Sequence, residues 1–133
     1  MVLLAAYPFV SFYLHDIGCC TIEAVWGEDT NDIFFREAVL QGLMFIRQHK
    51  VESWIADDRR LGPMEPHVLE WVAEEVLPAM AASGLRRLAM VESGDWLNRD
   101  LIKEAYMPPV ENLSIEIRHF ADVSSARAWA RSK

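Results

Sequence analysis

Two short apolar segments place the strongest constraint on the fold. Ser53–Asp57 (SWIAD) and Leu88–Val91 (LAMV) are nearly continuous apolar runs, which are typical of strands in parallel sheets because helices pack on both faces of such sheets. The stretch between them has apolar residues at helical spacing, at Leu69, Val72, Val76 and Met80. A strand, a helix and a second strand in this order predict a parallel pair joined by a right-handed crossover.

The N-terminal part of the chain predicts a hairpin followed by a helix. Val10–His15 and Cys20–Trp26 alternate in polarity on either side of a turn, which indicates an antiparallel hairpin. A packing helix is expected over residues 31–48, with Asp29 or Thr30 as its N-cap. Its apolar residues lie at helical spacing: Phe34, Phe35, Ala38, Val39, Leu43, Phe45 and Ile46.

Proline and glycine positions define the second helix. Pro66 suits its first turn, where the missing N–H has no helical acceptor. Pro78 is expected to kink or interrupt the helix, because it removes one helical hydrogen bond. Gly84 is expected to cap its C-terminal end.

The C-terminal part predicts two helices and a strand. A third set of apolar residues lies at helical spacing: Leu97, Leu101 and Ala105. Alternating residues indicate a strand with one wetter face, expected at a sheet edge: Leu113, Ile115 and Ile117. Asp122 can cap a last helix containing Ala126 and Trp129. The resulting order is ββαβαβαβα.

This order predicts an α/β fold in a single domain over residues 1–133. We expect one mixed, mostly parallel five-stranded sheet with an N-terminal hairpin and four helices. Ile55, Ala89 and Val91 should lie in its centre. A chain of 133 residues is long enough for one core.

Composition excludes several partners. The net charge of −7 opposes a nucleic-acid backbone. The apolar run Met1–Val10 lacks the cationic start of a signal peptide and is shorter than the roughly 20 residues that span a membrane, so we expect a soluble, cytoplasmic protein without a membrane span. The adjacent Cys19 and Cys20 are expected to be two buried thiols, with a vicinal redox or metal pair as the alternative.

Several local signatures follow one another along the chain in a particular order: Trp26-Gly27, Trp54-Ile55-Ala56-Asp57, Glu70-Trp71-Val72 with Pro78 and Gly84, Leu88–Val91, and Ala126 with Trp129. In order and spacing, from Val10 onward, they resemble the STAS family, the domain of bacterial anti-sigma factor antagonists and of anion-transporter tails. The resemblance is closest to a STAS-like branch often grouped with CRAL-TRIO lipid-transfer domains. It implies an interaction or regulatory module.

One departure from the family limits what the resemblance implies. Sigma-factor antagonists have a phosphorylated Ser or Thr after the third strand, at the start of the next helix. The equivalent stretch here, residues 57–65, contains no hydroxyl side chain. The kinase-switch mechanism of the family therefore does not transfer to this chain.

The loops that follow the parallel strands are where a binding site is expected, because ligands of open α/β sheets lie outside the carboxyl ends of the strands. The candidate binding residues in these loops are Asp57, Asp58, Arg59, Arg60, Ser93, Asp95 and Trp96. The alternative is structural: the two aspartates cap a helix or form a solvated cluster with the two arginines.

No residue pattern predicts catalysis, a cofactor or a metal site. The chain has no G-x-S-x-G motif and no Gly-rich phosphate loop, and its acidic and histidine residues near position 60 match no metal-loop spacing. We expect a non-enzymatic protein-interaction or regulatory module, acting as a homodimer or with a protein partner. Self-association is expected through Met1–Phe12 and an exposed helix face. The alternative is a carrier that binds a small apolar ligand or lipid in a pocket near the strand ends, with a hydrolytic enzyme as a third possibility.

Overall fold

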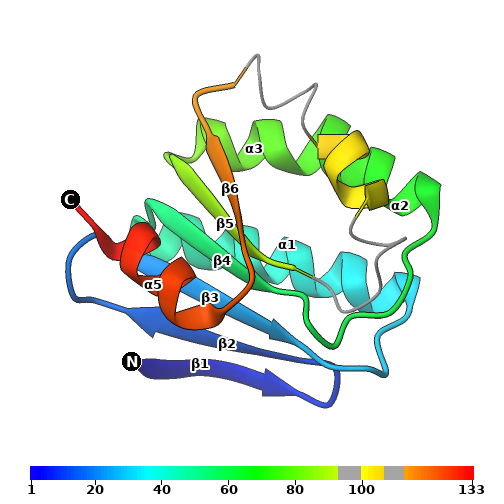
Figure 1. Cartoon of the computed structure of the whole chain (residues 1–133), viewed down its shortest axis with the longest axis horizontal. Coiled ribbons are helices and arrows are strands. Elements are labelled where there is room, and N and C mark those ends of the chain that lie inside the picture. The colour runs from blue at the N-terminus through cyan, green and yellow to red at the C-terminus, as the bar shows by residue number, and fades with distance from the viewer. Residues whose placement is uncertain (93–99, 107–112) are drawn as a thin grey trace.

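A six-stranded sheet forms the centre of the computed structural model, which describes residues 1–92, 100–106 and 113–133 (Figure 1). The strands lie side by side in chain order: β1 (Val2–Tyr7), β2 (Val10–His15), β3 (Thr21–Trp26), β4 (Ser53–Asp57), β5 (Arg87–Val91) and β6 (Glu116–Phe120). The pairs β1–β2 and β2–β3 are antiparallel, and the three other pairs are parallel. The predicted mixed, mostly parallel α/β sheet with its N-terminal hairpin is confirmed.

The number of strands was predicted wrongly, because β1 adds a sixth to the expected five. Its sequence, VLLAAY, does not alternate in polarity, so periodicity gave no strand signal. The pairing with β2 shifts register between Leu3 and Ala5, which disrupts the alternation of side chains between the two faces. Only the pairing with β2 identifies this segment as a strand.

The connections place most of the helices on one face of the sheet. Each crossover from β3 to β6 moves to the next strand in the same direction, so right-handed crossovers bring their helices to the same side. These helices are α1 (Asp32–His49), the continuous helix of α2 (Pro66–Trp71), η1 (Val72–Val76) and α3 (Leu77–Ala82), and a helical segment over residues 100–106. The last helix, α5 (Val123–Arg131), follows β6 and lies on the other face, in front of the sheet in Figure 1.

The second helix accommodates its proline as expected, through a change of helix type. The π-helical turn η1 directly precedes α3, and the Leu77 N–H donates to the Val72 carbonyl. The missing N–H of Pro78 falls just after this wider turn, where the regular hydrogen-bond ladder is already interrupted. Gly84, with a φ of 104°, follows the end of α3 and confirms the predicted cap.

The cap of α1 differs from the prediction. The Phe34 N–H donates to the Asn31 side chain at 2.8 Å, so Asn31 is the N-cap. The hydroxyl of Thr30 instead donates to the Phe9 and Gly27 carbonyls. Phe34 was also placed wrongly on the buried stripe: it is 41% exposed and stacks on Phe9. At the last helix, the predicted cap is confirmed, since Asp122 accepts the Ser125 N–H at 2.7 Å.

Two apolar cores fill the two faces of the sheet. The larger lies under α1 and the α2–α3 helix, and the smaller lies under α5. Ile55, Ala89 and Val91 are fully buried in the smaller core against Ala126 and Ala130. Their predicted central position is confirmed, and β6 lies at the sheet edge as predicted, although it begins at Glu116.

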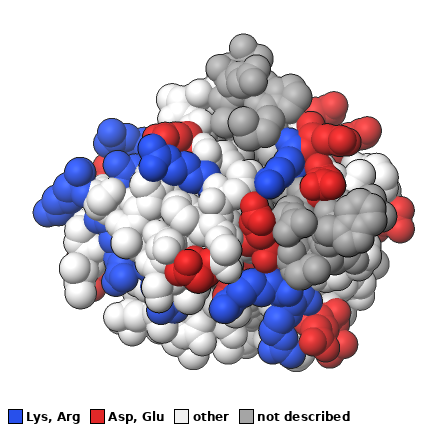
Figure 2. Space-filling model, viewed as in Figure 1, with Lys and Arg blue, Asp and Glu red and all other residues white. Residues whose placement is uncertain are grey.

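The other edge of the sheet exposes apolar side chains. On β1, Val2, Leu3 and Tyr7 are 55%, 52% and 42% exposed. The surface over this edge is mostly free of charged atoms on the face shown in Figure 2. The helix α1 also exposes four large apolar side chains, Ile33, Phe34, Leu40 and Met44. Tyr7 stacks on Phe9, and Phe9 stacks on Phe34, so this row of rings connects β1 with α1. We call Val2, Leu3 and Tyr7 the β1 edge.

Candidate functional site

The two adjacent aspartates of the predicted site lie on opposite faces of the sheet. Asp57 is the last residue of β4, and successive side chains along a strand point to opposite faces. Asp57 therefore lies on the face of α5, and Asp58 lies among the apolar side chains under the helices of the other face. Both are buried, at 3% and 4% exposure, so neither belongs to a solvated cluster.

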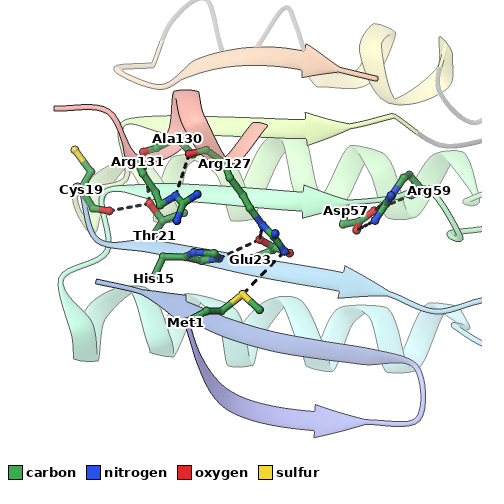
Figure 3. A network of polar contacts seen from close by, with 10 residues as sticks. All are labelled: Met1, His15, Cys19, Thr21, Glu23, Asp57, Arg59, Arg127, Ala130 and Arg131. Carbon is green, nitrogen blue, oxygen red and sulfur yellow. Dashed lines mark hydrogen bonds and ion pairs between the residues drawn. The ribbon is translucent and has the colours of Figure 1, made fainter. Parts of the chain in front are cut away.

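Asp57 forms a bidentate ion pair with Arg59. The guanidinium donates from Nε to Oδ1 at 2.8 Å and from its terminal nitrogen to Oδ2 at 2.7 Å (Figure 3). The Arg59 backbone N–H also approaches Oδ1 at 3.3 Å. Two parallel charge-assisted hydrogen bonds are a strong, geometrically specific arrangement. Asp57 and Arg59 thus form the structural ion pair that was the alternative to a binding site, but the Asp57 carboxylate is buried rather than solvated.

Asp58 has a different environment. Its backbone N–H donates to the Val91 carbonyl at 3.1 Å, which fixes the end of β4 against β5. Burial, and secondly the charge of Asp57, raise the pKa of the Asp58 carboxyl well above its ordinary value. The buried environment therefore favours the neutral acid over the carboxylate, relative to an aspartate in water.

Asp58 lines an apolar cavity of about 50 Å³ between the sheet and its helices. Of the described residues lining it, Asp58 and Tyr106 are the ionisable ones. Tyr106 comes from the helical segment 100–106 and is 6% exposed. Burial, and secondly the charge of Asp58, raise the pKa of this phenol, so its hydroxyl keeps its proton.

The structure does not pair Arg60, the other predicted site residue that it describes, with Asp57 or Asp58. The Nε atom of Arg60 lies 3.7 Å from Oε1 of Glu28, and both side chains are about two-thirds exposed. Ser93, Asp95 and Trp96 lie outside the described residues. The structure thus brings Asp57 and Arg59 together, and it separates both from Asp58.

A buried polar network near Asp57 was missed in the sequence. Glu23 on β3 is 1% exposed and accepts two hydrogen bonds from Arg127 on α5 (Figure 3). His15 Nε2 lies 3.0 Å from the same carboxylate. Burial lowers the pKa of His15, and Glu23 opposes this effect. The available signal was a charged residue, Glu23, in the middle of a strand whose other residues are uncharged.

The cysteines are only partly buried, so the prediction of two buried thiols was wrong in degree. Both are free, and the Cys19 thiol donates to the Ser132 carbonyl at 3.1 Å. Burial, reinforced by the charge of Glu52, raises the pKa of the Cys20 thiol, which disfavours the reactive thiolate.

Across the described ranges, the structure contains no group of three or more His, Cys, Asp or Glu residues able to hold a metal ion. None of the helices described is both long and apolar enough to cross a membrane. Comparison with known proteins found no matching family model, no matching curated protein and no matching solved structure.

Proposed function

We propose that the chain is a non-enzymatic interaction module whose partner is a second copy of itself, docked through the β1 edge. The observation that supports this proposal is that β1 lies at the edge of the sheet and exposes large apolar side chains there. It is the terminal strand of the sheet, and its large apolar side chains are about half exposed. An interaction module is also what the STAS-like resemblance implies.

The backbone of β1 favours a strand as the occupant of this edge. One side of the strand pairs with β2, and no strand among the described residues pairs with the other side. Unpaired N–H and C=O groups along an edge are a template for another strand, and proteins usually protect such edges with charged residues or proline. Residues 1–14 contain no Asp, Glu, Lys or Arg, and proline enters only after β1, at Pro8.

A second copy of the chain could pair with the free N–H and C=O groups of β1 and contact its apolar side chains. Two β1 strands related by a two-fold axis can pair antiparallel, so that the same patch contacts itself. Each chain has a net charge of −7, and an uncharged strand is the element through which two such chains can approach with least repulsion. Pairing would extend the sheet across the two copies and bring Val2, Leu3 and Tyr7 into contact with side chains of the second copy.

The experiment measures the solution mass of the full chain by light scattering over a range of concentrations. The expected mass is twice 15.2 kDa. Replacing Leu3→Lys and Tyr7→Lys together should shift it to one chain, because lysine side chains on an edge strand oppose its pairing with a second strand and repel those of the other copy. Ile17→Lys is the matched control, since Ile17 is 70% exposed but lies in the turn after β2.

Three results are decisive. A dimer that dissociates with the β1 changes and persists in the Ile17 control supports the proposal. A wild-type mass of one chain at the highest attainable concentration rejects it. A dimer that persists in the Leu3 and Tyr7 variant rejects the β1 edge as the interface.

A further inference from the structure

We propose that the cavity between the sheet and its helices binds a small uncharged molecule, whose apolar part packs against the lining and whose one hydrogen-bonding group meets Asp58 and Tyr106. This site is separate from the β1 edge, so the inference does not depend on the proposed dimer. It lies beside the end of β4, and the carboxyl ends of parallel strands are where α/β sheets bind ligands.

The position of Asp58 is the first argument. Burying a carboxyl group among apolar side chains lowers stability unless a partner compensates for the lost water. The nearest arginine in sequence, Arg59, is already paired with Asp57 on the other face. No Lys or Arg is present among the described residues that line the cavity. An ionisable group buried in a cavity with a shifted pKa marks a candidate ligand site.

The chemistry of the lining favours an uncharged ligand. A protonated carboxyl both donates and accepts, and the Tyr106 hydroxyl can do the same. An alcohol, amide or ketone can bond with these groups without bringing a charge out of water. An ammonium group would require Asp58 to ionise beside the charge of Asp57 and would add its own desolvation cost.

The volume of the cavity limits the size of the ligand. A cavity of about 150 Å³ is known to hold benzene, and this one, at about 50 Å³, suits a molecule of a few non-hydrogen atoms. It is too small for a lipid chain as it stands. Met64, Met80 and Met90 lie in the lining, and flexible thioether side chains can adjust to a bound molecule.

The test is an NMR titration of the full chain with ¹³C-labelled methionine methyl groups. The probes are ethanol, ethylamine and acetate, which are small enough for a cavity of about 50 Å³ and differ in charge at neutral pH. The alcohol is expected to shift the methyl signals of Met64, Met80 and Met90. The methyl of Met44, half exposed on α1, should not move and is the internal control.

Variants identify the polar contacts. Tyr106→Phe removes only the hydroxyl, and the loss of one hydrogen bond should weaken alcohol binding about tenfold. Asp58→Asn keeps a neutral donor and acceptor, so it should change the affinity by less than about threefold. Asp58→Leu removes both and should weaken binding at least as much as Tyr106→Phe.

Several outcomes would overturn the inference. If none of the three cavity methyl signals responds to the alcohol in the folded wild type, the site does not bind this ligand class. Tighter binding of the amine, abolished by Asp58→Asn, would show that the carboxylate rather than the acid is the recognition group. Unchanged affinity in both Tyr106→Phe and Asp58→Leu would show that the alcohol binds without these two residues.

Discussion

Arg127 on α5 and Glu23 on β3, 104 residues apart in the chain, meet in a two-hydrogen-bond ion pair with N···O distances of 2.7 and 2.8 Å (Figure 3). The apolar contacts of α5 lie over β4, β5 and β6. The pair therefore links this helix to β3, which is antiparallel to β2 and parallel to β4. It also supplies the buried Glu23 carboxylate with the charge that its burial requires.

Replacing Arg127→Met should lower the free energy of unfolding by about 2–4 kcal/mol, because it leaves Glu23 buried without its counter-charge. The Arg127 side chain is 30% exposed, which favours the lower part of that range. Urea denaturation measures the change. The double variant Glu23→Met with Arg127→Met should recover most of the loss. A loss below about 0.5 kcal/mol in the single variant would be no larger than a surface change and would contradict the assigned role.

The neighbouring arginines Arg59 and Arg60 provide a matched comparison. Arg59→Ala should cost about 1–3 kcal/mol, because the buried Asp57 carboxylate loses both side-chain donors and keeps the backbone N–H of residue 59. Arg60→Ala should stay within about 0.5 kcal/mol, since its contact with Glu28 is exposed. Thermal unfolding of the two variants at neutral pH gives both values. Equal losses would mean that the Asp57 pair does not stabilise the fold.

Gly42 lies on α1 directly against the indole ring of Trp54. A Cβ added there would lie 2.7 Å from Cζ3 and still closer to Cη2, and Trp54 is 4% exposed and has little room to move. Gly42→Ala should therefore cost about 1–3 kcal/mol through overpacking, although alanine favours helices. Gly62→Ala is the control, because an added Cβ there meets nothing within 4 Å. A Gly42→Ala variant as stable as the wild type in urea would show that α1 can shift away from the sheet.

The pH dependence of stability should report on Asp58. Its pKa is raised in the folded chain by burial and by Asp57, so between the ordinary pKa and the raised one the folded state holds a proton that the unfolded state has lost. Its contribution to the free energy of unfolding therefore falls as the pH rises above about 4. Asp58→Asn removes this dependence. The free energy of unfolding of the variant, relative to that of the wild type, should therefore increase as the pH rises towards neutrality.

Urea unfolding of both proteins at several pH values between about 4 and 7 measures this difference. His15 acts in the opposite sense, because its pKa is lowered by burial and the stability it contributes is lost as the pH falls below its ordinary pKa. Since His15 is present in both proteins, its effect largely cancels in the comparison. A stability difference that is constant across the range would contradict a raised pKa at Asp58.

Local patterns in the sequence determined the elements whose periodicity is regular. Continuous apolar runs marked β4 and β5 because both faces of these strands are covered, and Gly84 and Asp122 marked helix ends because caps need those backbone and side-chain properties. The π-helical turn before Pro78 also follows from a local cause, the missing N–H. These features depend on a few neighbouring residues, so a single sequence contains them.

The tertiary structure alone decided which distant residues meet. The strand β1 exists because β2 pairs with it, and Glu23 meets Arg127 because α5 returns over the sheet after β6. Asp58 meets the cavity of Tyr106 because all crossovers place their helices on one face, whereas Asp57 faces α5. Alternation along β4 puts adjacent residues on opposite faces, but only the packing of helices on those faces gives each carboxyl its partner. Asp57 and Asp58 are neighbours in the sequence, but their side chains lie on opposite faces of the sheet. The predicted loop site is therefore divided between the Asp57–Arg59 pair on one face and the cavity beside Asp58 on the other.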